Sequence, residues 1–232
     1  MSDPTQKGKI QSVLGLIDPA DLGLTMTHEH LLIDFSVMFN PSPDVTTQRM
    51  AHAPVSMENL GWIRQYCYSN LDNLLVLDED TAIEEAMLYQ RHGGGAIVDA
   101  TTIGIGRDPL ALARISRGAG LHVVMGAGYY VDAAQPNNIN EMNENDIYQE
   151  IVRDIQVGVG STGIKAGIIG EIGCTWPLKP NELKVLKASA RAQSETGASI
   201  LIHPGRDENA PIEILNILVD AGADISRVIM GH

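Results

Sequence analysis

Short apolar segments alternate with amphipathic segments along most of this chain, and this alternation constrains the fold more than any other feature. The apolar segments are rich in Ile, Val and Ala, and helical patterns with cap residues separate most of them. Near-continuous apolar strands of this kind are typical of a parallel sheet covered by helices. We expect strands at 25–34, 96–101, 122–130, 166–173, 198–203 and 227–232, and helices at 80–91, 108–119, 144–157, 180–196 and 211–221.

This alternation is typical of an α/β fold and fits two architectures, a TIM (β/α)8-type barrel and a doubly wound sheet. A barrel has eight strands in typically about 250 residues, so six β/α units would make an incomplete one. No break in composition divides the chain. We therefore expect a single domain over 1–232, in which 1–24 form an N-terminal hairpin or cap. The proline-rich stretch 35–55 predicts a long loop or lid.

The first predicted strand, TMTHEHLLID at 25–34, carries two histidines in apolar surroundings. Alternate residues of a strand point to the same face, so His28 and His30 are expected side by side, with Glu29 on the other face. Two imidazoles on one face of a buried strand indicate half of a metal site.

Three further metal-capable residues lie in the C-terminal halves of later predicted strands, namely Glu171, His203 and His232. The carboxyl ends of parallel strands form the reactive rim of an α/β fold. Any single histidine there could simply be solvated, but repetition at equivalent points favours convergence on one metal site. His52, His92 and His122 do not share this placement and are expected to be structural or solvated.

The charge balance limits the partners of the protein. Sixteen basic residues against 29 acidic ones give a net charge of −13, whereas a nucleic-acid binder normally has a basic surface. The composition therefore argues against nucleic acids and anionic membranes. No apolar run approaches the ~18 residues of a membrane span, and the N-terminus lacks a signal-peptide pattern. Since Cys67 and Cys174 show no paired motif, a cytosolic (cytoplasmic) location is expected.

Four motifs together, LTMTHEHLL, GIIGEIGC, LIHPGR and VIMGH, resemble the phosphotriesterase-related proteins of the amidohydrolase superfamily, over essentially the whole chain. The resemblance implies a (β/α)8 barrel with a binuclear metal centre. By motif, His28 and His30 would bind the buried metal and His203 and His232 the exposed one, while Glu171 would bridge them. Lys165 lies too early in its strand to replace Glu171 as a bridge.

The resemblance also implies a chemistry. Two divalent cations would lower the pKa of a bridging water and supply hydroxide as the nucleophile. The residue types suit zinc, with manganese or cobalt as alternatives. The family association is with small N-acyl amides such as N-acetyltaurine, and phosphotriester activity is not expected. Tyr129, Tyr130 and Arg206 are candidate contacts of a small-molecule substrate, and a homodimer is allowed.

One departure from the family pattern affects the predicted activity. The family places a metal-binding, proton-shuttling aspartate on the eighth strand, and no residue of this chain corresponds to it, because strands seven and eight are missing. We expect a C-terminally truncated barrel that binds metal poorly and has little activity. Two alternatives remain: a metal-dependent deoxyribonuclease of the TatD type, which the negative charge disfavours, and a non-catalytic barrel fragment that acts as an interaction protein.

Overall fold

A computed structural model describes residues 8–232 of the chain. Its main sheet has six strands, all parallel, in the order β10-β9-β8-β7-β6-β3. The strands are β3 (Leu24–Glu29), β6 (Gly94–Asp99), β7 (His122–Ala127), β8 (Ile168–Gly173), β9 (Ile200–His203) and β10 (Val228–Met230). The spatial order follows the chain order without reversal. A doubly wound sheet would reverse direction at a switch point, so this sheet is singly wound.

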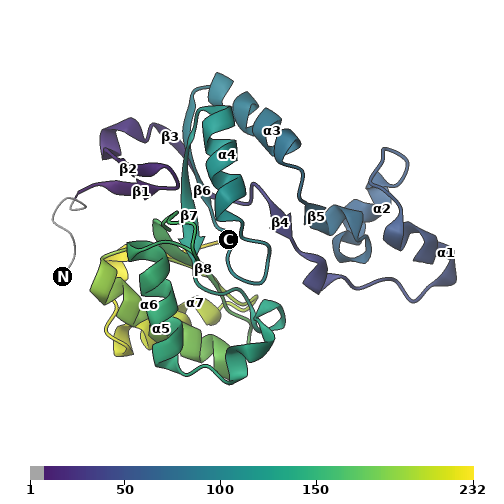
Figure 1. Cartoon of the computed structure of the whole chain (residues 1–232). Coiled ribbons are helices and arrows are strands. Elements are labelled where there is room, and N and C mark those ends of the chain that lie inside the picture. Colours follow the sequence, from purple (N-terminus) through teal and green to yellow (C-terminus); the bar gives the residue numbers. More distant parts are fainter. Residues whose placement is uncertain (1–7) are drawn as a thin grey trace.

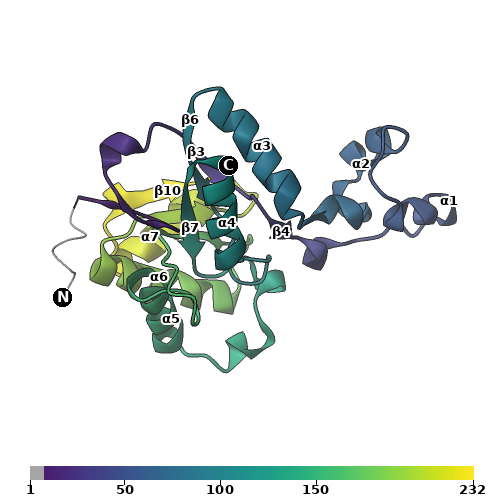
Figure 2. The same ribbon diagram turned by 45° about the horizontal axis from the view of Figure 1, so that its top comes forward.

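The sheet curls strongly into an open half-barrel (Figures 1 and 2). Five strand spacings of about 4.8 Å would separate the two edges of a flat sheet by about 24 Å. Instead, the rings of His28, on the first strand, and His232, just after the last, are only 5.0 Å apart. The predicted TIM-type barrel with six β/α units is therefore confirmed as a partial barrel.

Five longer helices connect the strands and pack on the outside of the sheet (Figure 1). They are α3 (Glu79–Arg91), α4 (Pro109–Ala119), α5 (Glu144–Gln156), α6 (Pro180–Thr196) and α7 (Ala210–Asp220). Capping interactions at their N-termini determine where several of these helices begin. Asp108 accepts a hydrogen bond from the Ala111 amide, and Pro109 occupies the first turn. Asn143 and Asp146 form a reciprocal capping box.

Because side chains alternate between the two faces of each strand, the sheet carries two apolar layers. The outer layer includes Met125, Ile169 and Ile200, which pack with the helices. A smaller inner layer contains Val124 and Leu201, so the inner face of the strands points into the barrel. The side chains that follow on this face, at the carboxyl ends of the strands, are consequently aimed at the rim.

An N-terminal hairpin covers the opposite mouth of the half-barrel. β1 (Ile10–Ser12) pairs antiparallel with β2 (Gly15–Ile17). The Val13 amide donates to the carbonyl of Val123 near the start of β7, and Ile10 packs on the inner apolar layer. Residues 1–7 of the expected cap lie outside the described part of the chain.

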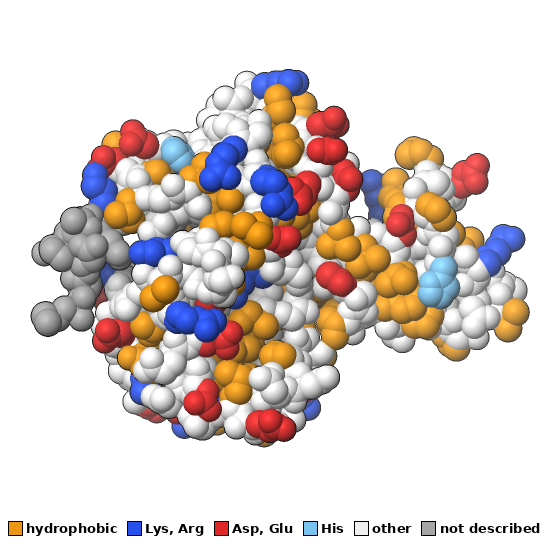
Figure 3. Space-filling model, viewed as in Figure 1, with side chains coloured by type: hydrophobic (Ala, Val, Ile, Leu, Met, Phe, Trp, Pro, Cys, Tyr) orange, Lys and Arg blue, Asp and Glu red, His pale blue; other side chains and the backbone are white. Residues whose placement is uncertain are grey.

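An arm between β3 and α3 departs from the sequence-based expectation. The predicted strand 25–34 ends at Glu29, and β4 (Ile33–Asp34) pairs with β5 (Leu75–Val76) at the base of the arm. The expected loop at 35–55 contains short helical segments, including α1 (Val45–Gln48), and α2 (Leu60–Gln65) follows. The arm projects from the body with hydrophobic side chains on its surface (Figures 1 and 3).

None of the helices within residues 8–232 has the length and hydropathy needed to cross a membrane.

Candidate metal centre

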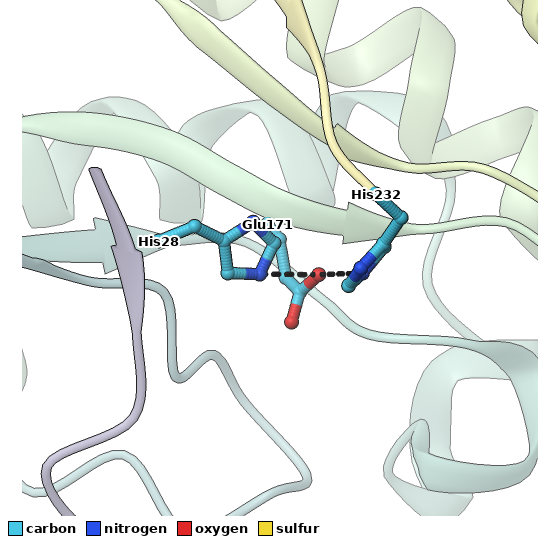
Figure 4. A group of neighbouring side chains, drawn as sticks. All are labelled: His28, Glu171 and His232. Carbon is cyan, nitrogen blue, oxygen red and sulfur yellow. Dashed lines mark ion pairs between the residues drawn. The ribbon is translucent and has the colours of Figure 1, made fainter. Parts of the chain in front are cut away.

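Glu171 lies at the centre of a cluster of four histidines on the carboxyl rim of the sheet. Its Oε2 atom lies 3.1 Å from His28 Nε2, 2.9 Å from His203 Nδ1 and 3.6 Å from His232 Nε2. Its Oε1 atom lies 3.2 Å from His30 Nε2. Figure 4 shows His28, on β3, and His232, just after β10, on either side of the carboxylate. The structure therefore brings all five predicted metal ligands together.

A local irregularity of β8 directs Glu171 into the cluster. The β8–β9 register shifts between Ile169 and Ile172, which places Glu171 on the inner side. Gly170 has a φ of 120°, and a Cβ there would lie 2.2 Å from the carbonyl oxygen of Leu201. Only glycine fits this close approach with a positive φ. The glycine before Glu171 in the GIIGEIGC motif is therefore required for steric reasons.

The charge state of Glu171 follows from its neighbours. Burial by itself would raise the pKa of this carboxyl, but the contacts with His203, His28 and His30 outweigh it and hold the pKa far below its usual range. The carboxylate in turn raises the pKa of His28, against the opposing effect of burial. Glu171 is therefore a buried anion, with 2% of its side chain exposed.

The geometry of the ring nitrogens tests whether a cation fits here. Three nitrogens approach the single atom Oε2, which has two lone pairs. One of them, His28 Nε2, is buried and has no aligned hydrogen-bond partner. His232 Nε2 and His203 Nδ1 also face each other at 2.8 Å. Such crowding of donor atoms around one anion fits divalent cations, and imidazole with carboxylate suits zinc, manganese or cobalt.

Thr101 orients His30 and was missed by the sequence analysis. The Thr101 hydroxyl donates to the carbonyl of Leu32 at 3.1 Å, so it accepts from His30 Nδ1 at 3.0 Å. With its Nδ1 proton donated to Thr101, His30 turns Nε2 toward Oε1 of Glu171 at 3.2 Å, a distance that calls for a proton or a cation between the two atoms. This orientation of a ligating histidine by an outer hydroxyl is a common feature of metal sites.

Asp99 holds the segment that carries the two N-terminal histidines. One of its oxygens accepts from the Leu31 amide at 2.8 Å and the other from the Thr101 amide at 3.1 Å. Complete burial raises the pKa of Asp99 to about 6. The sequence contained one signal for Asp99 as a site residue. Asp99 and Thr101 are two residues apart at the end of β6, as His28 and His30 are at the end of β3.

A cavity of about 300 Å³ opens beside this cluster. Its size is at the lower end of small-molecule sites. It is lined by His30, Ile33, Phe35, Tyr68, Ile105, Tyr130, Glu171, His203, Arg206 and His232. Two of the predicted substrate contacts, Tyr130 and Arg206, are therefore on its wall. Phe35 and Tyr68 come from the arm, and nothing in their sequence context marked them as site residues.

Tyr129 does not reach this cavity. Its side chain is 1% exposed, and its hydroxyl donates to Glu150 on α5. Adjacent residues of an extended segment point to opposite sides, so Tyr130 faces the rim while Tyr129 faces the helices. The expectation that Tyr129 contacts substrate is therefore corrected.

The remaining histidines lie apart from the cluster. His92 contacts the carbonyl of Leu88 at the end of α3, at 2.7 Å from Nδ1. His52 packs near Phe39 in the arm, with ring centroids 5.4 Å apart. His122 begins β7, at the end of the strand opposite the rim.

The fold and this cluster define a β/α-barrel protein with a histidine–carboxylate centre on its carboxyl rim. The sequence profile of the phosphotriesterase family matches residues 8–232. The chain belongs to the phosphotriesterase family.

Similar proteins match nearly all of the chain. N-acetyltaurine hydrolase from Homo sapiens is 45% identical over 226 residues, which cover 97% of this chain. A phosphotriesterase-related protein from Nematostella vectensis is 46% identical over 228 residues, with 97% of this chain and 65% of the relative covered. The chain spans 64% of the length of the human relative.

The chain also resembles solved structures over most of its length. A resiniferatoxin-binding protein from Rhodobacter sphaeroides superposes with a TM-score of 0.94 and 38% identity, covering 97% of this chain and 63% of that one. The phosphotriesterase homology protein from Escherichia coli, complexed with phosphate in its active site, has a TM-score of 0.72 and 29% identity. That match covers 91% of this chain and 63% of the other.

Proposed function

We propose that the protein is a divalent-metal-dependent hydrolase of small N-acyl amides. The observation that carries this proposal is the convergence of four imidazoles on one buried carboxylate at the barrel rim. Membership of the phosphotriesterase family and similarity to an N-acetyltaurine hydrolase support the reaction class and the substrate class. The same membership disfavours a deoxyribonuclease of the TatD type.

The five rim residues would hold two metal ions, with Glu171 between them. His28 and His30 would bind one metal, and His203 and His232 the other, as the family resemblance implies. When bound, the metals would supply Lewis-acid polarisation of the amide carbonyl and an acidified water as nucleophile. The negative charge of Glu171 balances part of the added positive charge, because its low pKa keeps it ionised.

The other residues of the cavity would position the substrate and exclude water. Phe35 and Tyr68 form an aromatic wall with Tyr130, since the Phe35 ring lies 6.2 Å from Tyr68 and 5.8 Å from Tyr130. Burial raises the pKa of Tyr130 well above its usual value. Tyr130 therefore keeps its proton at neutral pH and would act as a hydrogen-bond donor to substrate rather than as a base.

Replacement of Glu171 by Gln tests this proposal directly. The experiment measures metal content by elemental analysis and hydrolysis of N-acetyltaurine by release of free amine. We expect Glu171→Gln to lose metal and activity together, because a neutral amide cannot balance two cations. Glu195→Gln, which changes an exposed acid of α6, serves as the matched control and is expected to retain both.

Two outcomes would contradict the proposal. Full metal occupancy and full turnover in Glu171→Gln would exclude Glu171 as the central ligand. A wild-type protein that is soluble and monodisperse but holds no metal, even after incubation with zinc, would instead favour the alternative of a non-catalytic interaction protein.

A further inference from the structure

Among residues 8–232, Arg206 is the one Lys or Arg on the wall of the rim cavity. It lies in the loop between β9 and α7, three residues after His203, which contacts Glu171. Its side chain is exposed. Its charge acts on Tyr130, where it opposes the rise in pKa that burial causes. A positive charge is therefore held at the cavity mouth, beside the proposed reaction centre.

Arg206 also lacks a partner of its own. Within residues 8–232, its guanidinium makes no hydrogen bond or ion pair with the protein. Some other arginines of the body are paired, such as Arg107 with Asp154 and Arg114 with Glu79. Although the chain has 29 acidic residues, none within residues 8–232 pairs with Arg206. The guanidinium donors beside the cavity are therefore free for a ligand.

The rest of the cavity wall restricts where a charged ligand group can lie. Ile33, Phe35 and Ile105 provide apolar surface, and burying a charge against such surface is costly. An anionic group would therefore turn toward Arg206, whose planar donors match the oxygens of a carboxylate or sulfonate. Charge and shape together select a ligand with one anionic end.

We propose that Arg206 determines substrate specificity by binding a terminal anionic group, a sulfonate or a carboxylate, on the amine portion of the substrate. This proposal rests on the hydrolase function proposed above and defines its substrate class: N-acyl amides of short amino acids or aminosulfonates. Neutral amides of equal length would bind less tightly, because they leave the guanidinium unpaired.

The test compares one anionic and one neutral substrate of matched length, N-acetyltaurine and N-acetylethanolamine, in wild-type protein and in Arg206→Gln. We expect the KM for N-acetyltaurine to rise about 10- to 100-fold with a much smaller change in kcat, as loss of one charge-assisted contact predicts. The KM for N-acetylethanolamine should change far less. Arg206→Lys should recover part of the preference, and Arg117→Gln, at an exposed arginine of α4, should leave both substrates unaffected.

A binding measurement separates this proposal from the proposed reaction. Calorimetry would use the methanesulfonamide of taurine, in which a sulfonyl group replaces the acetyl carbonyl and resists hydrolysis, and the methanesulfonamide of ethanolamine as its neutral partner. Preference for the anionic probe that disappears in Arg206→Gln would support the role of Arg206 even if no amide is hydrolysed. Equal binding of the two probes by wild-type protein, no binding of either, or an equal loss of both in Arg206→Gln would overturn it.

Discussion

Substitution of Thr101 by Val should weaken metal binding although the side chain touches no proposed metal position. Thr101 is 1% exposed, and Val has nearly the same shape, so the change removes one hydroxyl with little change in packing. It breaks the 3.0 Å contact with His30 Nδ1 and the 3.1 Å bond to the Leu32 carbonyl. His30 is then free to rotate or to change its tautomer. Removing such an outer contact typically lowers metal affinity about 10- to 100-fold, equivalent to about 1.4–2.7 kcal/mol.

The assay is a competition titration of zinc against a chromophoric chelator, with urea unfolding of the metal-free protein measured in parallel. Loss of the two hydrogen bonds should also lower the free energy of unfolding by about 1–3 kcal/mol. Thr101→Ser keeps the hydroxyl and is the matched control, with an affinity close to that of wild type. Wild-type zinc affinity in Thr101→Val, or an equal loss in Thr101→Ser, would refute the proposed orientation of His30.

Three further predictions concern buried polar groups. Glu182 accepts hydrogen bonds from the amides of Asp132 and Thr175. Glu182→Gln leaves one buried donor unpaired and should therefore lower the free energy of unfolding, measured in urea, by about 1–3 kcal/mol. An unchanged value would show that the loops can relax. Arg107 pairs with buried Asp154 at 2.8 Å, so Arg107→Leu should cost about 3–5 kcal/mol in the same assay, and a loss below 1 kcal/mol would contradict it. Burial raises the pKa of Asp154 above 3.8. The stability that this carboxyl contributes is therefore complete below pH 3.8 and is lost as pH rises through the higher folded pKa. Unfolding titrations across this range should therefore show the free energy of unfolding of wild type falling relative to that of Asp154→Asn.

The secondary structure of the barrel could be predicted because its signals are local. The helix expected at 180–196 matches α6, Pro180–Thr196, and the strand expected at 198–203 contains β9, Ile200–His203. Proline at a helix start and runs of Ile with Val encode these elements within a few residues. The position of the rim histidines followed from the same regularity, because each lies near the end of a strand.

The arm and the outer contacts of the site could not be predicted in the same way. Phe35 and Tyr68 reach the cavity only because β4 and β5 pair at the base of the arm, and this pairing joins segments with no repeating pattern. Thr101 and Asp99 are ordinary residue types at a strand end. Their role depends on a neighbouring strand, β3, that lies about 70 positions earlier in the chain. Tyr129 was misassigned because the direction of a side chain beyond a strand end depends on the exact end of that strand.

The two oxygens of Glu171 bear on how the four histidines would divide between two metals. Oε1 lies near His30 only, whereas Oε2 lies near His28, His203 and His232. If Glu171 bridges two metals as proposed, His30 and His203, which lie on opposite oxygens, would bind different metals. This agrees with the division that the family resemblance implies, except for His28, which lies on the oxygen assigned to His203.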